Sequence, residues 1–124
     1  NLDNLSELTK RFGYTVGDGV LKDFAGLVQL MGDTEGMRGY NGVGRFVVFF
    51  EECSSKKAAA MIRILDKQVE EYNSLNPEYP IRYSAAWATT EETDTYEIRE
   101  LLRLSQKKWK QMEKEKKDKT EEET

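Results

Sequence analysis

The stretch GYNGVGRFVVFF, residues 39–50, predicts a tight hairpin that runs into a buried strand. Asn41 and Gly42 form a strong turn signal because both residue types tolerate positive φ angles. The residues after Arg45 are apolar on both faces, as in a strand with a neighbour on each side. Gly42 and Gly44 would let a ligand come close to the backbone, yet the whole stretch contains no carboxylate.

The composition excludes several classes of function. The chain has 124 residues, one domain's worth, and its net charge of −4 argues against a general nucleic-acid-binding protein. No apolar run approaches the roughly 20 residues of a membrane span, so no membrane contact is expected. The absence of histidine removes the commonest general base and transition-metal ligand. A single cysteine, Cys53, excludes an internal disulfide and fits a reducing compartment such as the cytoplasm.

Hydrophobic periodicity places helices on both sides of the hairpin. Ser54 or Ser55 is expected to cap the helix that follows the hairpin, because a serine hydroxyl accepts from a free N–H of the first turn. We expect helices over residues 4–12, 17–31, 56–73 and from residue 96 onward, and an alternating strand over residues 81–88. Residues 114–124 contain no apolar residue, so the domain is predicted to span residues 1–113 and the charged tail to be solvated, as a frayed helix end or disordered.

This order of elements predicts an α+β domain in which helices pack on an antiparallel central sheet. The buried strand after Arg45 needs two neighbours, and the hairpin supplies one of them. Residues 81–88 are the only other predicted strand. The opening residues, Asn1 to Asp3, have the pattern of a strand end, so the first strand of the sheet is expected to be missing from this chain.

The opening NLDNLSELTKRFGYTVGDGVL, residues 1–21, resembles the first motif of GGDEF domains, the diguanylate cyclase family, whose usual form is DxDxFKxINDxxGHxxGDxxL. GVGRF, residues 42–46, falls on the GGDEF signature itself. IRYSAAWA, residues 81–88, resembles the family's ISxGxA strand, and residues 101–116 resemble its last helix. The resemblance implies a nucleotidyl-cyclase palm, a ferredoxin-like fold whose first central strand ends at the DxD motif.

The resemblance also implies an activity, the joining of two GTP molecules into cyclic di-GMP by two domains that meet face to face. Such phosphoryl transfer depends on magnesium held by anionic oxygen ligands. The family's metal-binding carboxylates fall on Asn1, Gly44 and Arg45, so all three are replaced. We therefore expect no catalytic residue, no metal site and no cofactor; magnesium would be implied only for an active enzyme.

The nucleotide-binding positions implied by the resemblance are altered as well. The family's phosphate-side lysine falls on Ser6, and its guanine-reading asparagine falls on Thr9, which lacks a paired amide donor and acceptor. The second glycine of the signature is Val43, whose β-branched side chain resists positive φ. The vestigial nucleotide-binding positions are Ser6, Thr9, Asp18, Gly42, Val43 and Arg45.

Three further positions complete the comparison with the family. Asp18 either reads the guanine edge, as the resemblance implies, or caps the helix predicted to start there. Arg45 either stands in for the metal cation or is a solvated side chain at the hairpin edge. The family's inhibitory RxxD product site falls on DTEG, from Asp33 to Gly36, which does not match it.

The sequence therefore predicts a catalytically inactive GGDEF-like module of a larger bacterial cyclic-di-GMP signalling protein. Its expected role is regulatory, as an interaction or dimerisation module or as a GTP sensor. The expected partners are other domains of the same protein, a second copy, a GGDEF- or EAL-type domain, and GTP. The expected location is the cytoplasm, either alone or as part of a membrane-anchored protein. The alternative is an active diguanylate cyclase that uses rearranged ligands.

Overall fold

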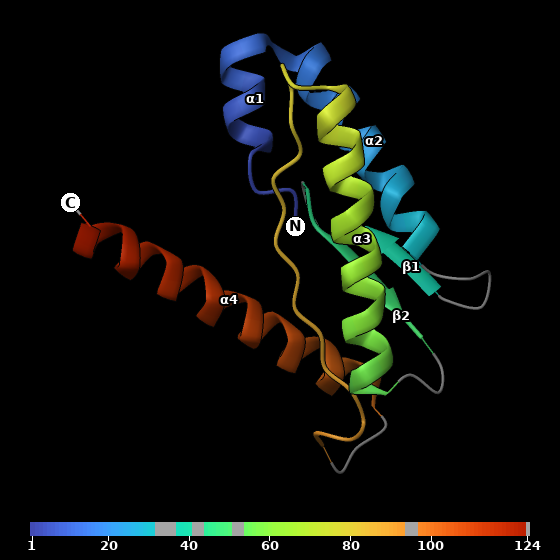
Figure 1. The fold of residues 1–124 in the computed structure, drawn as a ribbon. Coiled ribbons are helices and arrows are strands. Elements are labelled where there is room, and N and C mark those ends of the chain that lie inside the picture. Colours follow the sequence, from blue (N-terminus) through green and yellow to red (C-terminus); the bar gives the residue numbers. More distant parts are fainter. Residues whose placement is uncertain (32–36, 41–43, 51–53, 94–96, 124) are drawn as a thin grey trace. The chain divides into compact units, whose positions relative to one another are not determined.

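A computed structural model of the chain describes residues 1–31, 37–40, 44–50, 54–93 and 97–123, and it divides into two compact units, Asn1–Ser84 and Ala85–Thr124 (Figure 1). The first unit contains α1 (Leu5–Phe12), α2 (Tyr14–Met31), β1 (Met37–Tyr40), β2 (Phe46–Phe49) and α3 (Ser55–Leu75). The second contains α4 (Ile98–Glu123) and the segment that leads into it. Within the described ranges, no helix combines the length and the apolar character needed to cross a membrane.

Helices α1 and α2 are joined by the single residue Gly13, whose φ of 93° lies in the left-handed region that favours glycine. The N–H of Gly13 donates to the Thr9 carbonyl at 3.0 Å and closes the last turn of α1. Helix α2 then begins at Tyr14, so the predicted start at Gly17 is wrong. Because α2 begins at Tyr14, Asp18 lies inside the helix and cannot cap it.

The predicted hairpin is confirmed in its strands. Strands β1 and β2 are antiparallel, with Tyr40 opposite Phe46 and Met37 opposite Phe49. The turn predicted at Asn41 to Gly44 lies outside the described residues except for Gly44 itself. Among the described residues, β1 is the only strand paired with β2, and the side chains of β2 are all partly buried.

The first residues of the chain lie between the hairpin and the segment that follows α3. The N–H of Leu2 donates to the Gly44 carbonyl at 2.7 Å, and Leu2 forms an antiparallel bridge with Tyr83. This bridge is the only strand pairing in residues 81–88, so the predicted strand of that length is wrong for this structure. Two backbone hydrogen bonds flank this bridge, from the Asp3 N–H to the Arg82 carbonyl at 2.8 Å and from the Ser84 N–H to the Asn1 carbonyl at 3.0 Å.

Two side-chain amides supply hydrogen bonds to the backbone of residues 80–82 in place of a neighbouring strand. The buried Asn4 donates from Nδ2 to the Pro80 carbonyl at 2.7 Å and accepts from the Arg82 N–H at 3.1 Å. Asn73, near the end of α3, makes the matching pair with Ile81, at 2.9 Å to its carbonyl and 2.7 Å from its N–H. The two asparagines therefore satisfy consecutive backbone groups of an extended segment, because each amide offers both a donor and an acceptor.

The core of the first unit is centred on Phe24 of α2, which is 2% exposed. Its ring meets the rings of Phe46 and Tyr83, each at a centroid distance of 5.6 Å, and so joins α2 to the hairpin and to the extended segment. Helix α3 packs beside α2 (Figure 1). The buried hydrophobic residues are Leu2, Leu8, Val20, Phe24, Val28, Leu65, Val69 and Ile81.

Two tyrosine hydroxyls link α3 to neighbouring segments by hydrogen bonds. Tyr72 of α3 donates to Asp23 of α2 at 2.7 Å, and Tyr83 donates to Asp66 of α3. Burial, followed by the hydrogen bond to Asp23, raises the pKa of Tyr72 to about 12. The same two causes, with Asp66 as the acceptor, raise the pKa of Tyr83.

The capping predicted for α3 is confirmed. The Ser54 hydroxyl accepts from the Lys57 N–H at 3.1 Å, and the helix ends at Leu75, with Asn76 as its C-cap ahead of the proline. In the second unit, α4 continues through the charged end of the chain as far as Glu123, with exposed side chains over residues 114–119. Contacts one turn apart support this polar part of the helix, such as Gln111 to Glu115 at 3.2 Å.

We predict that Asn73→Ala destabilises the chain by about 3 kcal/mol, because it leaves both backbone groups of the buried Ile81 without partners. Asn76→Ala is the matched control on the same helix end, where the side chain is exposed, and should cost less than about 1 kcal/mol. Urea unfolding measures both. Equal losses for the two variants would contradict the role given to Asn73.

We further predict that stability falls as the pH rises from about 10 towards 12. An unfolded tyrosine loses its proton near pH 10, whereas folded Tyr72 holds it to about pH 12. The contribution of the hydroxyl is therefore complete below pH 10 and is lost above it. The double variant Y72F/Y83F should show a flatter fall in the free energy of unfolding across this window, and parallel curves would refute the prediction.

Candidate nucleotide and metal site

The positions predicted to have lost their metal-binding carboxylates come together at the start of β2. Leu2, the residue after Asn1, is hydrogen-bonded to Gly44 at 2.7 Å, and Arg45 follows with an exposed side chain. Gly44 is buried and has a φ of 78°. A Cβ at this position would lie 3.4 Å from the Leu2 carbonyl oxygen. At these three positions the chain therefore has the Asn1 amide, a glycine without a side chain at Gly44, and the Arg45 guanidinium.

One carboxylate, that of Asp3, lies beside these positions and is already engaged. Its Oδ1 accepts from Nδ2 of Asn1 at 2.6 Å and from the Ser84 hydroxyl at 2.9 Å. Ser84 is only 5% exposed, so its hydroxyl needs a partner within the protein. A cation that took this oxygen would have to displace two hydrogen bonds.

This donor set does not fit magnesium, which takes hard, anionic oxygen ligands in octahedral geometry. Among the residues described, no group of three or more potential acidic, histidine or cysteine ligands is close enough to hold a metal ion. The positive charge of Arg45 would also repel a divalent cation bound next to it. The absence of a metal site at Asn1, Gly44 and Arg45 stays a prediction.

The two positions implied to read guanine lie near each other at the α1–α2 corner. Thr9 of α1 packs on Gly17 of α2 so closely that a Cβ on Gly17 would lie 2.3 Å from its Oγ1. The Thr9 hydroxyl donates to the Leu5 carbonyl at 2.9 Å, within its own helix. This hydroxyl therefore serves the local backbone and cannot at the same time donate to a base.

Asp18 pairs with Lys22, one turn further along α2, at 3.0 Å. The hydrogen bond and the charge of Asp18 raise the pKa of Lys22. Of the two roles predicted for Asp18, helix capping is wrong, because α2 begins earlier at Tyr14. The guanine-reading role stays a prediction, and a base would have to compete with Lys22 for the carboxylate.

Of the remaining predicted positions, the structure describes only Ser6. Ser6 is exposed on the first turn of α1. Gly42 and Val43 lie outside the described residues, as do Asp33 and Gly36 of the unmatched product site.

Sequence reasoning missed three residues that organise the site: Asn4, Ser84 and Lys22. Lys22 could have been found from its spacing, since an acid four residues before a lysine in a helix is a standard ion pair. Asn4 resembles a helix cap, and it makes no such bond. Asn4 and Ser84 contact residues about eighty positions away in the chain, which no local pattern can reveal.

Helices α1 to α3, the β1–β2 hairpin and the extended residues 1–3 form an α+β domain. The altered metal positions of this domain lie at the start of β2. The chain belongs to the GGDEF family: the family described as "Diguanylate cyclase, GGDEF domain" matches residues 1–119. No curated protein and no solved structure matches the chain. Membership makes this a domain of cyclic-di-GMP signalling and implies a cyclase palm fold.

We predict opposite effects for two glycines of α2. Both replacements, Gly17→Ala and Gly19→Ala, gain up to about 1 kcal/mol of helix propensity. A Cβ on Gly19 meets no atom within 4 Å, so Gly19→Ala should stabilise. A Cβ on Gly17 collides with Thr9 at 2.3 Å, so Gly17→Ala should be net destabilising by about 1–2 kcal/mol. Thermal unfolding distinguishes them, and stabilisation by both would show that the α1–α2 corner is loosely packed.

Proposed function

We propose that the chain is a regulatory module of a bacterial cyclic-di-GMP signalling protein and does not itself make cyclic di-GMP. The observation that carries the proposal is the character of the metal positions, where Asn1, Gly44 and Arg45 offer no carboxylate. The neighbouring carboxylate of Asp3 is held by Asn1 and Ser84. In phosphoryl transfer, magnesium normally neutralises the charge that develops on the transferred group, and these three positions offer no carboxylate to hold it.

We also propose that a nucleotide bound here would be held through phosphate contacts to Arg45 and would not require magnesium. A guanidinium is suited to phosphate because its planar fork donates two parallel hydrogen bonds. Arg45 is exposed and directly follows Gly44, the last residue of the turn. Base recognition at this site is weakened, since Thr9 and Asp18 already have partners within their helices.

The partners that fit this role are other domains of the same signalling protein, a second copy of the chain, or a GGDEF- or EAL-type domain. Support comes from family membership, since GGDEF domains usually occur in multidomain signalling proteins. The proposed location is the cytoplasm, in keeping with a single cysteine in the sequence. The domain is proposed to end near residue 113, with the charged remainder of α4 as its solvated extension.

The proposal predicts no cyclic di-GMP when the chain is incubated with GTP and magnesium, as followed by chromatography. In calorimetry, GTP affinity should be the same with magnesium as with a chelator. Arg45→Ala should lower that affinity about tenfold, because a charge-assisted contact is removed. Lys107→Met, which removes the same charge from an exposed site on α4, is the control and should leave affinity unchanged.

Substantial turnover of GTP would overturn the proposal and establish the alternative, an active diguanylate cyclase with rearranged ligands. Affinity that collapses on chelation would instead overturn only the metal-independent mode of binding. An absence of any GTP binding would leave the interaction role and remove the sensor role.

A further inference from the structure

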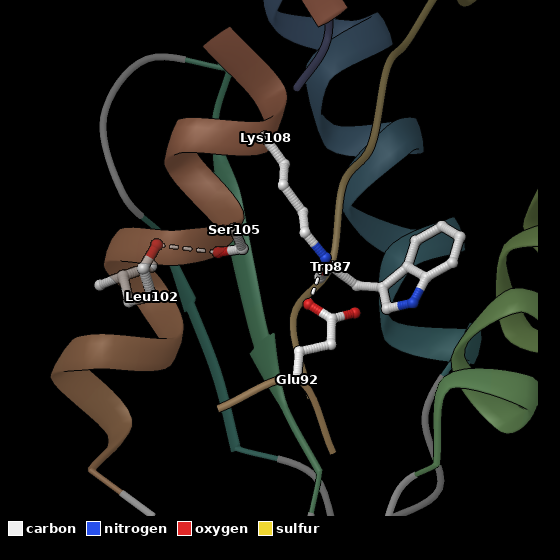
Figure 2. A network of polar contacts seen from close by, with 5 residues as sticks. All are labelled: Trp87, Glu92, Leu102, Ser105 and Lys108. Carbon is white, nitrogen blue, oxygen red and sulfur yellow. Dashed lines mark hydrogen bonds and ion pairs between the residues drawn. The ribbon is translucent and has the colours of Figure 1, made fainter. Parts of the chain in front are cut away.

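The second unit contains a lysine that joins α4 to the segment before it. Lys108, in the third turn of α4, extends its side chain back to residues 87–92 (Figure 2). Its ammonium donates to the Trp87 carbonyl at 3.0 Å and forms an ion pair with Glu92. One side chain thus engages both ends of a six-residue stretch.

The strength of this contact is intermediate. Both bonds are charge-assisted, which makes them stronger than hydrogen bonds between neutral groups. The side chains of Lys108 and Glu92 are, however, 39% and 30% exposed, so water and salt screen the pair. Such a contact can hold a segment in place and can also be opened without unfolding the protein.

Each of the two parts joined by Lys108 is also organised on its own. Before the helix, the Glu92 N–H donates to the Thr89 carbonyl at 3.0 Å, and Thr89 is 5% exposed. On α4, the Ser105 hydroxyl donates to the Leu102 carbonyl at 2.9 Å (Figure 2). The helix and the turn therefore have their own hydrogen bonds, and loss of the lysine contact should loosen residues 87–92 while leaving α4 helical.

We propose that Lys108 is a latch that closes residues 87–92 onto α4 and that opens when the charge of Lys108 or Glu92 is neutralised or screened. With the latch closed, α4 and the segment that leads into it move as one body. With the latch open, residues 87–92 can move relative to α4. This device uses no nucleotide and stands on contacts separate from the candidate site.

The test is hydrogen–deuterium exchange of the full 124-residue chain, read by mass spectrometry over residues 87–92 and over α4. Lys108→Met removes both contacts and should speed exchange in residues 87–92 about three- to tenfold. Glu92→Gln keeps the bond to the Trp87 carbonyl and should give about a twofold increase. Lys107→Met is the matched control on the exposed neighbour and should match the unaltered chain.

Salt provides an independent measurement. Raising the concentration from about 0.1 to 1 M shortens the Debye length from about 10 to 3 Å, so exchange in residues 87–92 should rise in the unaltered chain and not in Lys108→Met. Equal exchange in Lys108→Met and Lys107→Met would overturn the latch. Faster exchange along all of α4, with loss of helical circular dichroism, would also overturn it, because Lys108 would then support the helix rather than the closure.

Discussion

The first unit depends on how an extended segment without a full ladder is held in place. Asn4 and Asn73 supply the hydrogen bonds that a neighbouring strand would otherwise give, at consecutive backbone groups around Ile81. Because Asn4 precedes α1 and Asn73 lies in the last turn of α3, the same contacts fix the start of one helix and the end of another. Tyr83 then reaches Asp66, and Ser84 reaches Asp3.

Several polar groups of the candidate site already have partners within the protein. Asp3 has accepted two hydrogen bonds, Thr9 serves the carbonyl of Leu5, and Asp18 is paired with Lys22. A ligand would have to break such contacts before forming its own, and each broken bond subtracts from its affinity. These polar groups therefore contribute hydrogen bonds and an ion pair to the fold itself.

Much of the fold could be predicted from local patterns. The helix α1, the serine cap of α3 and the pairing of β1 with β2 follow from periodicity, capping chemistry and turn residues, which act over a few positions. The early start of α2 was missed because Gly13 turns the chain in one residue. The extended segment was mistaken for a regular strand, because alternation of side chains gives no information about how many neighbours the backbone has. In the site, the family motif located Asn1, Gly44 and Arg45, whereas the partners Asn4 and Ser84 come from distant parts of the chain.

Gly44 bears on how readily the altered site could change back. Its φ of 78° is a conformation that glycine adopts freely and that other residues, with the partial exception of asparagine and aspartate, adopt at a cost of about 1 kcal/mol or more. A glutamate placed there would carry this backbone strain, and its Cβ would lie 3.4 Å from both the Leu2 carbonyl oxygen and a methyl group of Leu5. A carboxylate side chain at residue 44 would thus be attached to a strained backbone. An acidic residue at position 44 therefore carries a cost in folding stability that glycine does not.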